Sequence, residues 1–246
     1  MPDTPYTIPE GGSLGLLAYG HIGLERWREV RGTAWKDAQR EAVETARTAA
    51  PGPTLSPDML LTVVTGLPRS GTSMAMQMLV AGGLPAFTDG QREADESNPR
   101  GYYEHDRVRS LATDPDWVPD ADGHAVKVVA PLAVHLPQGA RYDVILMERD
   151  VDEVLRSQSA MLGRSGEASA DAQVLRPAYQ RFLDETLAWA ERTPGVRLLR
   201  VRHAAAIESP ADVAAQLADF CSAPDPLDAH AMASAVDPSL YRERTS

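Results

Sequence analysis

Apolar residues beyond the first fifty positions gather in short runs that alternate with longer segments of helical spacing. Three of the runs are typical of strands buried on both faces of a sheet: residues 60–64, 125–130 and 142–147. Residues 196–201 are predicted to form a fourth strand. Four further segments have the character of helices: residues 74–80, 150–162, 171–191 and 210–220. Because strands and helices alternate, the pattern predicts an α/β fold with a doubly wound parallel sheet.

An amphipathic segment precedes the first of these strands. Residues 13–49 repeat apolar side chains at helix spacing, and charged residues fill the other face. The Pro-Gly-Pro sequence at 51–53 then ends the predicted helix. In the simplest interpretation this helix packs on the core of the protein. In the alternative it docks a partner or forms a homodimer, through Trp27 and Trp35.

The charge of the chain limits the partners that it can bind. It has 24 Lys and Arg residues against 35 Asp and Glu residues, a formal net charge of -11 at pH 7. Nucleic acids and anionic membranes are held by clustered cations, so neither is a predicted partner. A small polyanion stays compatible with this charge if a helix N-terminus supplies local positive potential.

The cellular location is predicted from what the sequence lacks. No apolar run approaches the length of about 18 residues that suggests a membrane span. The first residues lack the basic and apolar stretches of a secretion signal. Cys221 is the only cysteine, so no internal disulfide can form. We therefore expect a cytoplasmic protein.

The segment from Gly66 to Ser73 joins the first predicted strand to its helix with the spacing of a phosphate-binding P-loop. Gly66 and Gly71 let the backbone wrap so that successive N–H groups point at one anion, and the helix N-terminus adds its dipole. ATP- and GTP-binding loops carry Lys where this chain has Thr72, and the nearby cation is instead Arg69. The planar guanidinium of Arg69 suits phosphate or sulfate oxygens.

Residues 68–73 resemble the 5'-phosphosulfate loop of sulfotransferases that use 3'-phosphoadenosine 5'-phosphosulfate (PAPS), in which Lys or Arg occupies the position of Arg69. In that family a second strand ends in Arg, a Ser follows eight residues later, and the two side chains hold the 3'-phosphate. Arg149 and Ser157 have this spacing after the predicted strand at 142–147. The resemblance therefore implies one nucleotide site built from the two motifs.

The resemblance covers roughly residues 60–162. Residues 94–104 are similar to a stretch of a group of bacterial sulfotransferase-like proteins, and residues 236–242 carry a weaker similarity. We therefore divide the chain into an N-terminal leader with a helical extension at 1–55 and a P-loop, sulfotransferase-like domain at 56–246. The resemblance implies contacts with the cofactor PAPS from these residues: Arg69, Ser70, Gly71, Thr72, Ser73, Arg149, Ser157 and Arg242.

Simpler interpretations remain open at the second motif and for the whole chain. Arg156 or Ser159 could make the contact in place of Ser157, and Arg149 could simply neutralise the acidic residues after it. Asp150 and Glu153 are spaced as a capping box at the start of that helix. The alternatives to a sulfotransferase are a P-loop kinase that acts on a small molecule and a non-catalytic nucleotide-binding module.

The chemistry of the family implies transfer of a sulfuryl group from PAPS to a hydroxyl or amine of a small-molecule acceptor, with 3',5'-ADP as the product. Such a transfer needs in-line positioning of the substrates, neutralised charge on the equatorial oxygens and an activated acceptor. The six histidines have no ligand spacing and only one cysteine is present, so no protein-built metal site is predicted.

The general base stays open between several residues. Cytosolic sulfotransferases of animals use a His two residues after a strand Lys; Lys127 matches that Lys, but the second position is Val129. Other branches of the family use a carboxylate after the strand that follows the P-loop helix. Asp89, after a predicted strand at 84–88, is the first candidate by that spacing, and Glu104 is the second.

His105 and His135 are the remaining candidates for the base, although a lone His is more often structural. Asp89 followed by a glycine has an equally simple interpretation as a turn. The resemblance thus implies catalytic roles for these residues: Asp89, Glu104, Arg69 and Lys127.

Overall fold

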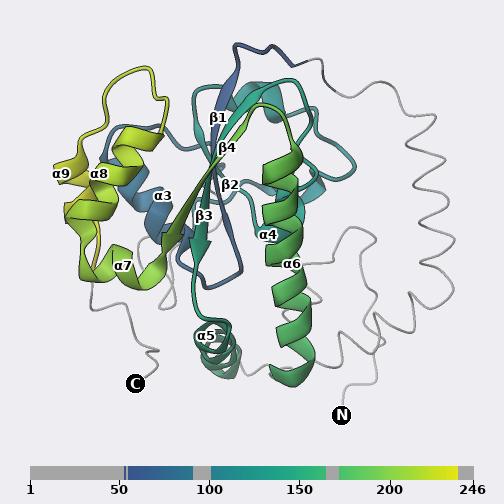
Figure 1. Ribbon diagram of the computed structural model, residues 1–246, viewed down its shortest axis with the longest axis vertical. Helices are drawn as coiled ribbons and strands as arrows, with labels where there is room; N and C mark the ends of the chain where they lie inside the picture. Colours follow the sequence, from purple (N-terminus) through teal and green to yellow (C-terminus); the bar gives the residue numbers. More distant parts are fainter. Residues whose placement is uncertain (1–52, 54, 91–100, 165–171, 238–246) are drawn as a thin grey trace, which may run out of the picture. The chain divides into compact units, whose positions relative to one another are not determined.

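Figure 1 shows the computed structural model of the chain, which describes residues 53, 55–90, 101–164 and 172–237. The chain divides into two compact units, one of residues 1–50 with 159–171 and one of residues 51–158 with 172–246. The helix predicted at 13–49 and the cofactor contact predicted for Arg242 lie outside the described residues. Both assignments stay predictions, as does the domain boundary at residue 55.

The described part of the chain forms a four-stranded parallel sheet with the strand order β2-β1-β3-β4. Its strands are β1 (Leu60–Gly66), β2 (Ala125–Lys127), β3 (Arg141–Glu148) and β4 (Val196–Arg202). The residues of β1 and β3 are buried along almost the whole length of each strand, which explains their continuous apolar runs. The predicted α/β class with a parallel sheet is therefore confirmed.

The second strand is shorter than the sequence predicts. It ends at Lys127 rather than at residue 130, although the N–H of Val128 still donates to the carbonyl oxygen of Val64 at 2.9 Å. A short helix, α4 (Ala130–Ala133), begins where the strand was expected to continue, with a proline in its first turn. The apolar run at 125–130 thus contains both the end of a strand and the start of a helix.

The strand predicted at 84–88 is wrong. Ala86 makes a single bridge to Ala125, outside the named strands of the sheet. Pro85 has no N–H group with which to extend this pairing, so the segment does not continue as a ladder. Asp89 consequently follows an irregular segment rather than a strand end.

The longer helices agree with the predicted segments to within two residues: α3 (Thr72–Ala81), α5 (Val151–Arg164), α6 (Ala172–Arg192) and α8 (Pro210–Phe220). Besides α4, four short elements were not predicted: α7 (His203–Glu208), α9 (Ala229–Ser234) and the 3-10 helices η1 (Asp106–Ser110) and η2 (Val118–Ala121). Elements of four to six residues are too short to show helical periodicity. None of the helices in the described ranges has the length and apolarity to cross a membrane.

Helices cover both faces of the sheet, as Figure 1 shows. On one face, α3, α7, α8 and α9 enclose a core that includes Val64 and Ile145. On the other face, α6 and the two 3-10 helices enclose a core that includes Val63 and Val144. Successive residues of a strand point to opposite faces, so both faces of β1 and β3 are removed from water. The carboxyl ends of the strands are then the place where a ligand reaches the sheet.

The start of α5 confirms one half of the predicted capping box. Asp150 Oδ1 accepts hydrogen bonds from the backbone N–H groups of Asp152 at 2.9 Å and Glu153 at 3.2 Å. The carboxylate of Glu153 does not return to Asp150; its Oε2 instead accepts from Arg149 Nε at 3.0 Å. The side chain that would have completed the box is thereby directed to the end of β3.

Candidate active site

The order of the strands places a topological switch point between the carboxyl ends of β1 and β3. From β1 the chain crosses to β2 on one side and then to β3 on the other side. In parallel sheets, ligands bind outside the strand ends at such a switch point. The loop at 67–71 follows β1 directly, and Arg149 follows β3 directly. The two motifs that were predicted to bind PAPS therefore meet at one edge of the sheet.

Two glycines let the loop at 67–71 approach its neighbours closely. A Cβ atom on Gly66, where φ is 152°, would lie 2.5 Å from Ser70 Oγ. A Cβ atom on Gly71, where φ is 101°, would lie 2.5 Å from Cδ2 of His203. Positive φ angles favour glycine, and these close approaches leave no room for a side chain. The loop therefore depends on both glycines of the motif.

The same loop contains a strained residue and a buried hydroxyl group. Arg69 has a φ of 69°, in the left-handed region, which costs a non-glycine residue about 1–2 kcal/mol. Ser70 is 1% exposed, and its Oγ has no hydrogen-bond partner among the residues that the structure describes. The N-cap residue of α3 is Gly71, which has no side chain that could accept a hydrogen bond from the first turn of the helix. Strain, an unpaired hydroxyl and an uncapped helix N-terminus together make a place where an anion can bind.

Arg149 contacts both the loop and α5. Its Nη1 donates to the carbonyl oxygen of Arg69 at 3.0 Å, and its Nε donates to Glu153 Oε2 at 3.0 Å. The side chains of Arg149 and Glu153 are only 8% and 6% exposed, so this ion pair is buried. Ser157, one turn further along α5, is also buried, and its Oγ accepts from Arg69 Nε at 3.2 Å. The structure thus brings Arg69, Arg149 and Ser157 together.

The sequence left two alternatives open for this motif, one for the residue that accompanies Arg149 and one for the role of Arg149 itself. Arg156 and Ser159 are exposed, whereas Ser157 is buried against Arg69. Arg149 does pair with one of the acidic residues that follow it, as its simpler interpretation expected. Because the same guanidinium also holds the loop, charge neutralisation is only part of its role. Contact of these residues with a nucleotide stays a prediction.

Lys127 joins the start of α3 to the segment that precedes η1. Its Nζ donates to Ser73 Oγ at 3.1 Å, to the carbonyl oxygen of Tyr102 at 3.0 Å and to Glu104 Oε1 at 3.0 Å. An ammonium group has three N–H donors, so it can donate to these three acceptors at the same time. Lys127 is buried, whereas 28% of the Glu104 side chain is exposed. The pair therefore places a partly exposed carboxylate beside the first turn of α3.

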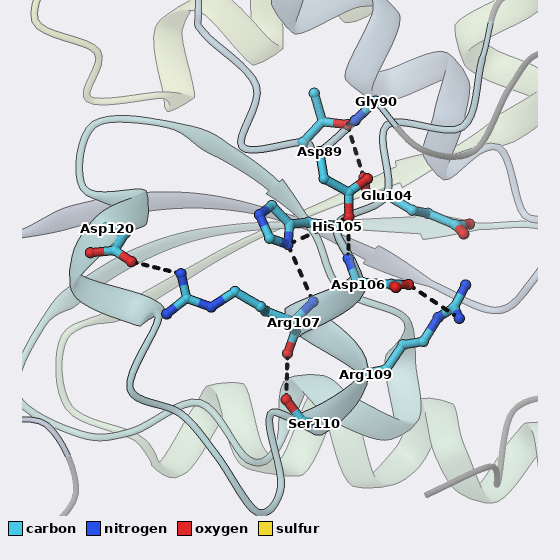
Figure 2. Close-up of polar contacts among 10 residues, drawn as sticks. Asp89, Gly90, Glu104, His105, Asp106, Arg107, Arg109, Ser110 and Asp120 are labelled. Carbon is cyan, nitrogen blue, oxygen red and sulfur yellow. Dashed lines mark hydrogen bonds and ion pairs between the residues drawn. The ribbon is translucent and has the colours of Figure 1, made fainter. Parts of the chain in front are cut away.

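The carboxylate of Asp89 caps the start of η1, as Figure 2 shows. Its Oδ2 accepts from the backbone N–H of Asp106 at 2.7 Å, and 15% of the side chain is exposed. His105 Nδ1 lies 3.8 Å from the same oxygen and accepts from the N–H of Arg107 at 3.2 Å. In Figure 2 the Glu104 side chain extends away from the Asp89 carboxylate. The two candidate bases thus have different surroundings.

Two further residues that the sequence analysis named, Thr72 and His135, differ in their exposure to solvent. Thr72, which stands at the Lys position of ATP-binding loops, is buried in the first turn of α3. His135, the last candidate base, is exposed in the turn after α4. Within the described ranges, no group of three or more His, Cys, Asp or Glu side chains could hold a metal ion.

His203 is a buried residue of the site that the sequence pattern did not indicate. It directly follows β4, just as Arg149 directly follows β3, and this position is the signal that could have identified it. Burial and, secondarily, the charge of Arg149 lower the pKa of His203 to about 4, against an opposing effect of Glu153. The imidazole is therefore uncharged near neutral pH, where it packs against Gly71.

Acidification is expected to destabilise the fold through His203. The folded protein keeps this imidazole neutral down to about pH 4, whereas the unfolded chain takes up the proton near the ordinary pKa of 6.5. Protons therefore favour the unfolded chain, and the free energy of unfolding falls between these pH values by at most about 3 kcal/mol. Urea titrations over this pH range should show a smaller fall in His203→Gln than in the wild type.

His230→Gln is the matched control for this experiment because His230 is exposed in α9. This variant should keep the pH dependence of the wild type. A His203→Gln protein whose stability falls with pH as steeply as that of the wild type would contradict the assigned role of the buried imidazole.

No family model and no curated protein matches this chain. Among solved structures, the chain is similar to a sulfotransferase domain from the curacin biosynthetic pathway, with a TM-score of 0.42 and 13% sequence identity. The similarity covers 70% of this chain and 76% of that chain. A similarity of this size does not define a function.

Proposed function

We propose that the chain transfers a sulfuryl group from PAPS to a hydroxyl or amine group of a small-molecule acceptor. The observation that carries the proposal is the contact network between the ends of β1 and β3, in which Arg69 meets Ser157 and Arg149 meets the loop. These residues are the ones whose spacing resembles the two nucleotide-binding motifs of PAPS-dependent sulfotransferases. A nucleotide with two separate anionic groups needs both motifs at one edge of the sheet.

The residues at this edge fit such a nucleotide. The loop backbone, the Ser70 hydroxyl and the N-terminus of α3 would hold the 5'-phosphosulfate. The buried Ser70 Oγ, which has no hydrogen-bond partner in the described part of the chain, supports this assignment. Arg149 and Ser157 would hold the 3'-phosphate through charge-assisted and neutral hydrogen bonds. When bound, PAPS would supply the sulfuryl group that is transferred.

Three side chains would act on the transfer itself. Arg69 brings a positive charge to the loop, where it can stabilise negative charge that develops on the transferring group. Lys127 fixes Glu104 beside the first turn of α3 through its contact with Ser73. Glu104 would accept the proton of the acceptor hydroxyl or amine.

The contacts favour Glu104 over Asp89 as the base, in reverse of the order that spacing favoured. Asp89 Oδ2 already accepts from the N–H of Asp106 at 2.7 Å, so turning it toward a substrate would leave this N–H at the start of η1 without that acceptor. The Glu104 side chain is more exposed, at 28% against 15% for Asp89. It also shares Lys127 with Ser73, which follows the phosphate loop.

The protein is expected to bind 3',5'-ADP about ten to a hundred times more tightly than 5'-AMP. A charge-assisted hydrogen bond to the 3'-phosphate contributes about 1.5–3 kcal/mol, and this free energy corresponds to that ratio of affinities. Isothermal titration calorimetry with the two nucleotides measures the ratio directly. ATP should bind more weakly than 3',5'-ADP, since the loop lacks the lysine that grips β- and γ-phosphates.

Ser157→Ala should reduce the preference for 3',5'-ADP, because it removes one proposed contact with the 3'-phosphate. Ser159→Ala, which alters an exposed serine on the same helix, is the matched control and should leave the preference unchanged. Equal affinity for 3',5'-ADP and 5'-AMP would exclude the 3'-phosphate site. Tighter binding of ATP than of 3',5'-ADP would favour a kinase instead.

A further inference from the structure

A closed ring of contacts joins the phosphate loop to the first turns of α5. Arg149 Nη1 donates to the carbonyl oxygen of Arg69 at 3.0 Å, and Arg69 Nε donates to Ser157 Oγ at 3.2 Å. Glu153 Oε2 accepts from Arg149 Nε at 3.0 Å and closes the ring, because Glu153 and Ser157 lie one turn apart on the same side of α5. We call these four residues the contact ring.

Within the contact ring, Glu153 has no direct role in binding a phosphate. Its side chain is 6% exposed, and a buried carboxylate is costly unless a partner compensates its charge. By charge alone, Glu153 would weaken the binding of an anion in the adjacent loop. The presence of an acid at this position therefore needs an explanation other than anion binding.

The geometry of the guanidinium supplies that explanation. The group is planar and rigid, so fixing Nε of Arg149 against Glu153 also sets the direction in which Nη1 points. Nη1 reaches the carbonyl oxygen of Arg69, the residue whose left-handed φ of 69° needs support from its surroundings. The orientation of the Arg149 side chain is thus coupled to the conformation of the loop.

We propose that Glu153 is a positioning residue, which orients the Arg149 guanidinium so that Arg149 holds the phosphate loop in its anion-binding conformation. The Arg69 side chain then points toward Ser157, to whose Oγ its Nε donates a hydrogen bond. The consequence for sulfuryl transfer rests on the proposed function. The consequence for the conformation of the loop does not, and it can be measured without any nucleotide.

Hydrogen exchange of the Ser70 amide reports on the loop in the ligand-free protein, because this N–H donates to the carbonyl oxygen of Leu67 at 3.1 Å. In Glu153→Ala, which removes the acceptor for Arg149 Nε, we expect the Ser70 amide to exchange at least about tenfold faster. Glu153→Gln keeps an amide oxygen that can accept from Nε. Its exchange rate should therefore stay close to that of the wild type.

Arg149→Lys tests the same coupling with the buried charge pair retained. A lysine keeps a cation for Glu153, but its single nitrogen cannot replace Nε and Nη1 together. The Ser70 amide should again exchange about tenfold faster. Asp152→Ala alters the neighbouring acid on α5, which pairs with Arg176 outside the contact ring, and should leave the rate unchanged.

Calorimetry with 3',5'-ADP separates this inference from the proposed function. Positioning predicts that Glu153→Ala binds 3',5'-ADP about tenfold more weakly, whereas an electrostatic effect alone predicts tighter binding. If the wild type does not bind 3',5'-ADP, the proposed function fails and the exchange rates alone decide the role of Glu153.

Two results would overturn the positioning role. The first is a wild-type exchange rate at Ser70 in both Glu153→Ala and Arg149→Lys. The second is exchange in Glu153→Gln that is as fast as in Glu153→Ala. If Glu153→Ala does not fold, the comparison of Arg149→Lys with Glu153→Gln decides by the same criterion.

Discussion

Glu104→Gln is expected to lower the rate of sulfuryl transfer by a factor of about 10² to 10⁴, the usual cost of losing a general base. The glutamine amide oxygen can still accept from Lys127 Nζ, which lies 3.0 Å from Glu104 Oε1 in the wild type. The contacts of Lys127 with Ser73 and Tyr102 should therefore survive. The variant loses the ability to take up a proton while its surroundings stay intact, so 3',5'-ADP should bind with nearly wild-type affinity.

Asp89→Asn is the matched comparison, because the asparagine oxygen can still accept a hydrogen bond from the Asp106 N–H at the start of η1. Its effect on turnover should be milder than that of Glu104→Gln. Transfer of labelled sulfate from PAPS to a panel of phenols, alcohols and amines, at saturating PAPS, measures both variants.

A larger loss in Asp89→Asn would assign the base to Asp89, as the spacing alone favoured. Wild-type turnover in both carboxylate variants, together with an inactive His135→Ala that still binds 3',5'-ADP, would exclude a carboxylate base. Inactivity of the wild type toward every acceptor, combined with tight binding of 3',5'-ADP, would point to the non-catalytic alternative.

The central strands of the sheet could be predicted from the sequence because helices bury both of their faces. β1 and β3 then become continuous apolar runs that need no knowledge of distant contacts. The run at 125–130 misled because apolar residues suit a buried strand and a buried helix equally well, and only Pro131 marks the change. The segment at 84–88 misled because its proline, rather than its apolar character, decides whether it can join the sheet.

The proximity of the candidate site residues could also be predicted, since residues at the carboxyl ends of parallel strands meet at one edge. Lys127 ends β2, Arg149 follows β3, and His203 follows β4, although only the first two match a motif. The partners of the charged side chains could not be predicted. Glu153 is spaced to complete a capping box but turns to Arg149, because a buried guanidinium needs a charged partner more than a helix N-terminus needs a second cap.

Arg69→Ala is expected to lower turnover by about 10² to 10³, as the removal of a group that stabilises charge in a transition state typically does. The loop backbone and the N-terminus of α3 supply much of the free energy that binds the nucleotide in the ground state. The affinity for 3',5'-ADP should therefore fall less than about tenfold. Alanine tolerates the left-handed φ of 69° about as poorly as arginine does, so the variant adds little new strain to the backbone. The carbonyl oxygen that accepts from Arg149 is also retained.

Arg69→Lys separates the role of the planar Arg69 guanidinium from the effect of its charge alone, and Arg156→Ala is the control for loss of an arginine elsewhere. Lysine keeps the positive charge but loses the planar donors, one of which reaches Ser157 Oγ at 3.2 Å, so turnover should recover only in part. Arg156→Ala removes an exposed arginine of α5 and should leave turnover unchanged. Steady-state kinetics at varied PAPS concentration distinguish the outcomes, because a transition-state contact lowers kcat whereas a ground-state contact raises KM. If Arg69→Ala raises KM for PAPS with kcat unchanged, Arg69 binds the donor but does not stabilise the transferring group.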